Sequence, residues 1–232
     1  MMTIRRSDER GKAEHGWLKS RHSFSFADYH DPAYESFGPL RVINEDWIDG
    51  GAGFPPHPHR DMEIVTYILD GAIAHKDSTG GGGTIRPGEI QRMSAGSGIV
   101  HAEFNASADE VCHLLQIWIM PSKRGIEPGY EQKTIDAAAV RNHFARIAAP
   151  EPVANEVRLV QDAEIWVAKL DPGVEAIHSM AQGRKVWLQV AKGEVKLEDQ
   201  VLTAGDAAAI DDVQQIAVRS VSAAEVLLFD LA

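Results

Sequence analysis

The chain has 232 residues, of which 34 are acidic and 23 basic, so its formal net charge is −11. This negative balance argues against direct binding to nucleic acid, which depends on clustered Lys and Arg side chains. No apolar run approaches the roughly 18 residues that span a membrane, and the charged first ten residues lack the apolar core of a secretory signal.

Short apolar and β-branched runs alternate with turns rich in glycine, proline and aspartate. The clearest runs are residues 40–43, 64–69, 111–120, 157–160, 165–170, 186–190 and 226–231. Short strands separated by such turns are typical of a β-sandwich or β-barrel. We therefore predict an all-β protein in which the tryptophans belong to the core: Trp47, Trp118, Trp166 and Trp187.

One stretch, residues 136–147, has helical spacing of its apolar side chains. It lies between Pro128-Gly129 and the prolines at 150 and 152, which suggests a connector between two domains. A weak internal repeat supports this division, because residues 63–77 can be laid over residues 185–199 with Gly71 opposite Gly193. We predict an N-terminal domain at 1–130, a helical linker at 131–155 and a C-terminal domain at 156–232.

Two short motifs carry candidate metal ligands. In His57-Pro58-His59 the two imidazoles are two residues apart, so on a strand they point to the same face. His101-Ala102-Glu103 offers a second such pair, after glycines that permit a tight turn. Three histidines and a carboxylate suit a divalent transition metal and leave coordination positions open, which is typical of a catalytic site.

These motifs resemble those of a known family. Gly51, His57-x-His59, Glu63 and Gly71 resemble the first cupin motif, and Gly88, Gly98-x-x-His101 and Asn105 resemble the second. The segment Gly98-Ile-Val-His-Ala-Glu103 is similar to the signature of the pirin family, as are His22–Pro32, Leu40–Asn44, Tyr130-Glu-Gln and Glu225–Asp230. The resemblance covers nearly the whole chain and is to the bacterial pirin-like quercetin 2,3-dioxygenases.

The resemblance implies a bicupin of two jelly-roll barrels, with a metal bound by His57, His59, His101 and Glu103. Glu63 is then a residue that packs or orients a ligand. Iron(II) is the expected native metal, and copper, nickel, zinc, manganese or cadmium could replace it in a recombinant sample. Opposite the ligands, the second domain has Ser179, Ala181, Val218 and Ser220, so we expect one metal per chain.

The implied activity is cleavage of a flavonol ring with O2 and release of CO, with Glu103 accepting the proton of the substrate hydroxyl. Two alternatives stay open: a redox-responsive regulatory protein that acts through a protein partner, and a cupin that binds sugars or other small molecules without oxygenase activity. We expect a monomer. The single cysteine, Cys112, permits no intrachain disulfide, and a cytoplasmic protein is the natural expectation. His75, His113 and His178 are expected to be packed or hydrogen-bonded rather than ligands.

Overall fold

The structure is a computed structural model that describes residues 1–232. The chain divides into two compact units. The N-terminal unit comprises Gly11–Thr134 and Val157–Gln161, and the C-terminal unit comprises Met1–Arg10, Ile135–Glu156 and Asp162–Ala232. Both are built from strands, and the only helical element is a 3₁₀ turn, η1 (Ser7–Glu9). No helix is long and apolar enough to cross a membrane.

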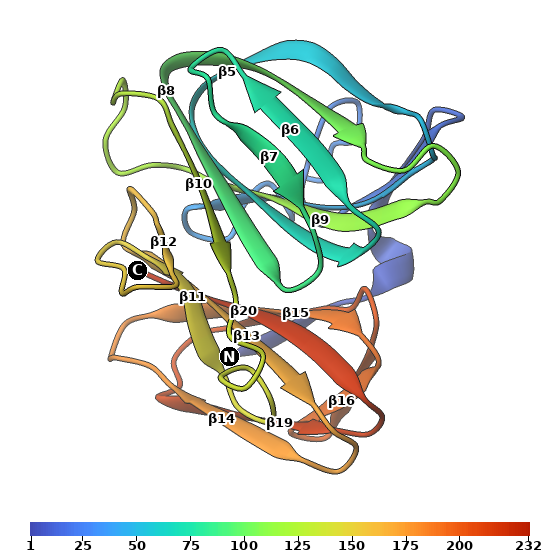
Figure 1. Cartoon of the computed structure of the whole chain (residues 1–232). Coiled ribbons are helices and arrows are strands. Elements are labelled where there is room, and N and C mark those ends of the chain that lie inside the picture. Colours follow the sequence, from blue (N-terminus) through green and yellow to red (C-terminus); the bar gives the residue numbers. More distant parts are fainter. The chain divides into compact units, whose positions relative to one another are not determined.

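The N-terminal unit contains a nine-stranded sheet in the order β2–β3–β4–β9–β5–β8–β6–β7, with β10 also paired to β8 (Figure 1). The nine strands are β2 (Gly11–Glu14), β3 (Leu18–His22), β4 (Leu40–Ile48), β5 (Gly53–Asp70), β6 (Ile73–Asp77), β7 (Gly82–Ile85), β8 (Glu89–Asn105), β9 (Cys112–Ile119) and β10 (Gly129–Thr134). The short β12 (Val157–Arg158) also belongs to this unit but not to this sheet. At 18 and 17 residues, β5 and β8 are far longer than the others. Their paired length allows one sheet to curl into both walls of a barrel.

The C-terminal unit contains two sheets. One has the order β1–β18–β15–β20–β13–β11 and the other the order β14–β19–β16–β17. The strands are β1 (Met2–Arg5), β11 (Ala145–Ala149), β13 (Ala163–Leu170), β14 (Glu175–Ser179), β15 (Lys185–Lys192), β16 (Glu194–Leu197), β17 (Gln200–Thr203), β18 (Ala207–Ile210), β19 (Gln215–Ser220) and β20 (Ala224–Leu231). Strand β1 pairs with β18, so residues 1–10, which the sequence analysis assigns to the N-terminal domain, belong to this unit.

The two units share one strand order, as the internal repeat predicts. The run β4–β9–β5–β8 corresponds to β13–β20–β15–β18, and β5–β8–β6–β7 corresponds to β14–β19–β16–β17. The turn glycines that the repeat pairs also agree, with φ of 75° at Gly71 and 76° at Gly193. A Cβ at Gly193 would lie 2.1 Å from the carbonyl oxygen of Ala223, so this turn requires glycine in both conformation and space.

The predicted helical linker is wrong. Residues 137–140 form a turn, Asn142 has a φ of 65°, and the chain then enters β11, which pairs with β13. Val140, Phe144 and Ile147 are buried as their spacing suggests. The pairing of β11 with β13 buries apolar side chains of this segment while its backbone is extended. This tertiary pairing decides the structure, although the spacing of the apolar residues favours a helix.

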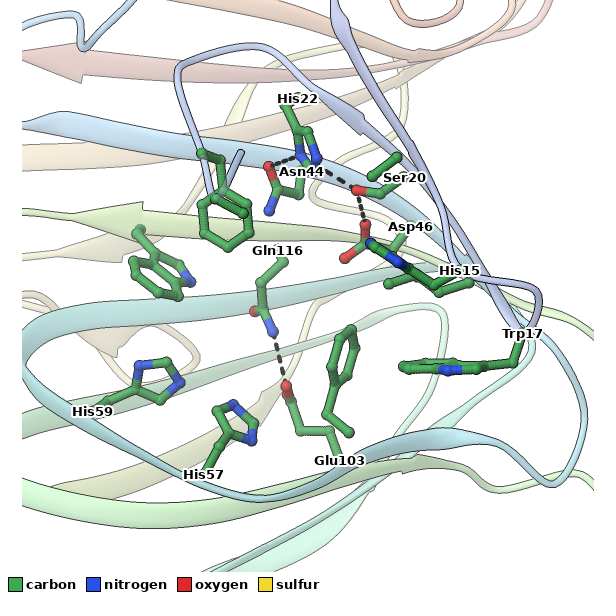
Figure 2. Close-up of a pocket in the computed structure, with 16 residues that line it drawn as sticks. His15, Trp17, Ser20, His22, Asn44, Asp46, His57, His59, Glu103 and Gln116 are labelled. Atoms are coloured by element: carbon green, nitrogen blue, oxygen red, sulfur yellow. Dashed lines mark hydrogen bonds between the residues drawn. The ribbon is translucent and has the colours of Figure 1, made fainter. Parts of the chain in front are cut away.

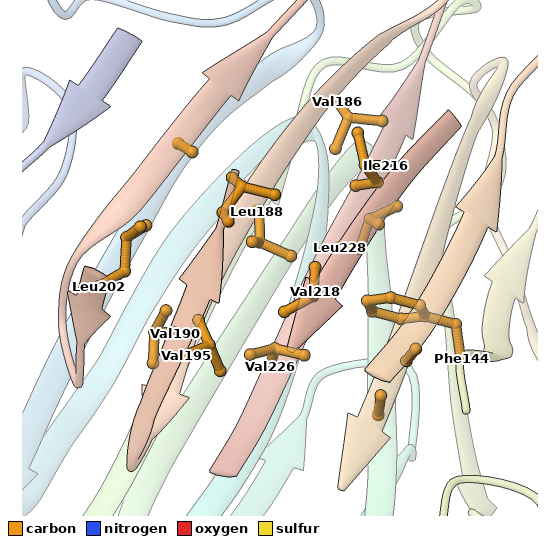
Figure 3. Close-up of a cluster of buried hydrophobic side chains, with 14 of the residues drawn as sticks. Phe144, Val186, Leu188, Val190, Val195, Leu202, Ile216, Val218, Val226 and Leu228 are labelled. Carbon is orange, nitrogen blue, oxygen red and sulfur yellow. The ribbon is translucent and has the colours of Figure 1, made fainter. Parts of the chain in front are cut away.

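Alternation of buried and exposed residues explains why the C-terminal strands form. In β14 and β19 every second residue is buried. In contrast, every residue of β20 is buried, because this strand lies between β15 and β13 and is covered on both of its faces. The inward side chains make one apolar cluster, shown in Figure 3, in which Leu188, Val190, Val226 and Leu228 lie close together. Burial of such alkyl groups is the main source of stability for this unit.

Candidate metal centre

The segment His57-Pro58-His59 lies in the part of β5 that pairs with β8 but not with β9. Proline has no amide hydrogen, and this one-sided pairing tolerates it. Irregularities in the β5–β8 register flank the segment, one before His57 and one between His59 and Asp61, whose φ is 66°. Such bulges redirect side chains, and here both imidazoles face inward while Pro58 is exposed.

His57, His59 and His101 converge as the sequence analysis predicts. His57 pairs directly with His101 across β5 and β8. The ring centroids lie 4.4 Å apart for His57 and His101, 4.8 Å for His57 and His59, and 4.9 Å for His59 and His101. One ligand nitrogen from each ring lies within 4.8 Å of the other two, so the three can meet at one cation. This set is a histidine-triad metal site.

The protonation of the triad suits a metal. Burial lowers the pKa of His59 to about 4 and that of His101 to about 3, and neighbouring histidines lower both further. Nδ1 of His57 lies 2.9 Å from the carbonyl oxygen of Pro55, so it carries the proton and leaves Nε2 as a lone-pair donor. Nε2 of His101 is buried without a hydrogen-bond partner, which a bound cation would satisfy.

Glu103 lies beside the triad. Its Oε2 accepts a hydrogen bond of 2.9 Å from the side-chain amide of Gln116, which accepts one from Thr66. Burial raises the pKa of Glu103 to about 7, and the charge of Asp46 raises it further. A carboxylate oxygen of Glu103 falls within 4.8 Å of ligand nitrogens of His101 and His75, a second set that shares His101 with the triad.

The triad is the better cation site of these two sets. In the second set, Nε2 of His75 is 3.1 Å from Oδ2 of Asp77, and its Nδ1 is 3.4 Å from Nδ1 of His101. Both nitrogens of His75 therefore already have partners, as the sequence analysis expects for this residue. His75 supports His101 rather than competing with it for the metal.

His57 and His59 of the triad line a cavity of about 480 Å³, within the size range of small-molecule sites. Figure 2 shows His57, His59 and Glu103 at one side of it and Trp17 at another. The walls include four aromatic side chains that the sequence analysis does not assign to the site: Trp17, Phe26, Phe54 and Trp118. Trp118 makes an edge contact with His59 at 5.0 Å. Trp118 therefore lines the cavity and also packs, half-buried, against the core cluster that contains Ile64 and Met93. Trp187 is fully buried as predicted, whereas Trp47 and Trp166 are only half-buried.

The cavity is also lined by polar side chains that the sequence analysis does not assign to the site: Ser20, His22, Asn44, Asp46 and Gln116. His22 and Asn44 belong to segments that resemble pirin sequences, so that resemblance is the signal that could have identified them. Ser20, Asp46 and Gln116 carry no motif, and only the folded barrel brings them together.

His113, His178 and Cys112 behave as expected. His113 hydrogen-bonds Glu45 at 2.9 Å and stacks on Trp47. His178 is buried in the C-terminal unit and hydrogen-bonds Asp230. Burial raises the pKa of Cys112 to about 12, which excludes a reactive thiolate near neutral pH. Glu63 is fully buried and accepts a hydrogen bond from the backbone of Val160, so it acts as a packed strand carboxylate.

Two all-β units of one strand order, with a histidine triad at a cavity in the first, define a two-domain metal-binding cupin. Residues 3–119 match the family model described as Pirin, and residues 146–231 match the one described as Quercetinase C-terminal cupin domain. The chain belongs to the pirin family.

Relatives of known name cover the chain from end to end. It is 45% identical over 231 residues to quercetin 2,3-dioxygenase of Escherichia coli K12, covering all of this chain and 99% of that protein. The crystal structure of YhhW from Escherichia coli has a TM-score of 0.96 and 45% identity, covering 100% of this chain and 98% of that one. The structure of bacterial pirin YhhW in complex with nickel(II) has a TM-score of 0.94 and 44% identity, covering 100% and 99%.

Proposed function

We propose that this protein is a quercetin 2,3-dioxygenase, which cleaves a flavonol with O2 to give a depside and carbon monoxide. The observation that carries the proposal is the triad of converging imidazoles, two of which line a cavity that also has aromatic rings in its wall. The full-length relative named quercetin 2,3-dioxygenase supports the choice of reaction. All the atoms of O2 and the flavonol are accounted for in the two products.

We propose that His57, His59, His101 and Glu103 are the metal ligands and that iron(II) is the native metal. Imidazole and carboxylate donors accept several divalent transition metals, so geometry and availability rather than affinity select among them. The nickel(II) in the related YhhW structure agrees with such a tolerant donor set. The metal, when bound, acidifies a coordinated flavonol hydroxyl and brings substrate and O2 together.

Glu103 is proposed to accept the proton of that hydroxyl. The side-chain amide of Gln116 donates a hydrogen bond to Oε2 of Glu103 and so holds the carboxyl in place. A pKa of about 7 makes the carboxyl able to accept and release a proton near neutral pH. The aromatic walls around it exclude water and offer flat surfaces to a planar substrate.

Metal binding is proposed to be confined to the N-terminal unit. In the C-terminal unit, Val218 on β19 corresponds to His101, and it pairs with Ala176 on β14, as His101 pairs with His57. Both side chains are buried alkyl groups. The same register places Ala176 and His178, rather than the predicted Ser179 and Ala181, at the positions of His57 and His59. The C-terminal unit therefore keeps one histidine of the triad and lacks the other two.

The proposal is tested by incubating iron-loaded protein with quercetin in air and measuring loss of the flavonol and release of carbon monoxide. We expect turnover that disappears after chelation and returns when iron(II) is added back. Turnover that is indifferent to chelation, or loss of quercetin without carbon monoxide, would contradict it.

Glu103 as a ligand predicts a pH-dependent proton release on metal binding. In the metal-free protein its pKa of about 7 leaves Glu103 protonated below pH 7, and coordination requires the carboxylate. Nickel binding should therefore release about one more proton from wild type than from Glu103→Gln at pH 6, and the difference should vanish by about pH 8. His59 and His101 add nothing in this window, because their pKa values of about 4 and 3 keep them neutral.

Calorimetry in buffers of different ionisation enthalpy measures this proton release directly. The affinity of wild type should rise with pH up to about 7 and then level off, while that of Glu103→Gln should be weaker and flatter. Equal proton release by the two proteins at pH 6 would show that Glu103 does not ligate the metal.

A further inference from the structure

The side of the cavity formed by β3 and β4 is polar, although none of its residues belongs to the proposed metal centre. Ser20 and His22 come from β3, and Asn44 and Asp46 come from β4. The metal ligands come instead from β5 and β8. Figure 2 shows the four polar side chains lying across the cavity from His57 and His59.

Hydrogen bonds fix most of this polar group. Nδ1 of His22 lies 2.7 Å from Oδ1 of Asn44, and the hydroxyl of Ser20 donates to Oδ1 of Asp46 at 2.5 Å. Asp46 is 5% exposed. Its Oδ2 accepts no hydrogen bond from the protein, and Figure 2 shows this second oxygen directed into the cavity.

An unpaired carboxyl oxygen in such a buried position is costly unless a ligand supplies the missing partner. Burial raises the pKa of Asp46 to about 7, with the neighbouring charge of Glu45 adding to the effect, while the Ser20 hydroxyl and the charge of His113 lower it. Near neutral pH the carboxyl can thus accept or donate a hydrogen bond. A phenolic hydroxyl, which also does both, matches it in either state.

We propose that Asp46, held by Ser20, is a subsite that binds a ring hydroxyl of the substrate at the side of the cavity opposite the metal. This inference rests on the proposed function and narrows its substrate class. The substrate is a planar aromatic compound that carries one hydroxyl for the metal and at least one more, remote from it, for Asp46. Between the two polar sides, Trp17 and Phe54 are in edge contact at 5.1 Å and provide an apolar wall for the rings.

The test compares two flavonols that share the metal-binding end. Quercetin carries additional ring hydroxyls, whereas 3-hydroxyflavone has none beyond its 3-hydroxyl. Dissociation constants are measured without oxygen on nickel-loaded wild type and Asp46→Ala. We expect wild type to bind quercetin at least about tenfold more tightly than 3-hydroxyflavone, and Asp46→Ala to lose most of that preference while its affinity for 3-hydroxyflavone stays within about threefold.

Two further variants separate binding from folding. Asp46→Asn keeps an acceptor for Ser20 but replaces the free oxygen with a donor, so its preference for quercetin should fall to an intermediate value. Asp109→Asn, in an exposed loop of the same unit, should behave as wild type. An unchanged preference in both Asp46 variants, or an equal loss of affinity for the two flavonols, would overturn the subsite.

Turnover is read separately from binding. Selective binding that depends on Asp46, without any release of carbon monoxide, would refute the dioxygenase and support the subsite. Turnover of quercetin with a preference that Asp46→Ala does not alter would refute the subsite alone. If wild type binds neither flavonol, both the dioxygenase and the subsite are refuted.

Discussion

His101→Ala should abolish metal binding and reduce quercetin turnover at least about 100-fold. The triad offers one nitrogen from each of three rings, and the substitution leaves only His57 and His59, too few donors for a stable site. The metal-free variant should be folded but somewhat less stable than wild type. The substitution removes a buried Nε2 that has no hydrogen-bond partner, but it creates a void and leaves Nδ1 of His75 without its partner.

Metal content and thermal unfolding measure the two parts of this prediction. Iron or nickel should raise the melting temperature of wild type, because a ligand that binds only the folded state stabilises it, and should leave that of His101→Ala unchanged. His143→Ala removes an exposed histidine of the C-terminal unit and serves as the matched control. Full metal content in His101→Ala would show that the cation lies elsewhere.

The triad could be predicted from sequence because its geometry is local. Side chains two residues apart on a strand point to the same face, so His57 and His59 form half of the site regardless of where the strand lies in the fold. The other half needs only that β8 pair with β5, which the spacing of the cupin motifs implies. The cavity could not be predicted in the same way. Asp46 and Glu103 line the same cavity only through the curvature of the whole sheet, and nothing within β4 marks that aspartate as facing a cavity.

Residues 136–147 show the opposite limit. Apolar side chains at intervals of three and four residues are compatible with a helix that buries one face. They are equally compatible with a turn followed by a strand, when the rest of the protein covers both. The pairing of β11 with β13 selects the strand over the helix. Its hydrogen bonds join segments that are separated in sequence, so the local spacing of apolar residues cannot predict them. Trp118 shows a similar limit, because a large aromatic side chain can pack against the core and line a cavity at the same time.

A chain of hydrogen bonds behind His101 determines which of its nitrogens faces the metal. Asp77 accepts through Oδ2 from Nε2–H of His75, so Nδ1 of His75 is left as an acceptor for Nδ1–H of His101. That arrangement directs the Nε2 lone pair of His101 to the triad. Asp77 is itself fixed, because its Oδ1 accepts from the backbone and hydroxyl of Thr79 and from the backbone of Gly81.

Asp77→Asn should weaken nickel binding about 10- to 100-fold by reversing this chain. The new amide would keep Oδ1 for Thr79 and Gly81, but its nitrogen would donate to His75. His75 would then carry its proton on Nδ1 and oppose the proton on Nδ1 of His101.

The measurement for Asp77→Asn is a nickel dissociation constant, obtained by competition with a chelator, alongside the melting temperature of the metal-free protein. The affinity should fall while the melting temperature stays within about 2 °C of wild type, because the loop bonds persist. His75→Leu, which deletes the relay, should weaken binding to a similar degree. Asp70→Asn, at an exposed carboxylate of the same unit, is the matched control. Wild-type nickel affinity in both Asp77→Asn and His75→Leu would show that the hydrogen bonds of His75 and Asp77 are not needed to orient His101 toward the metal.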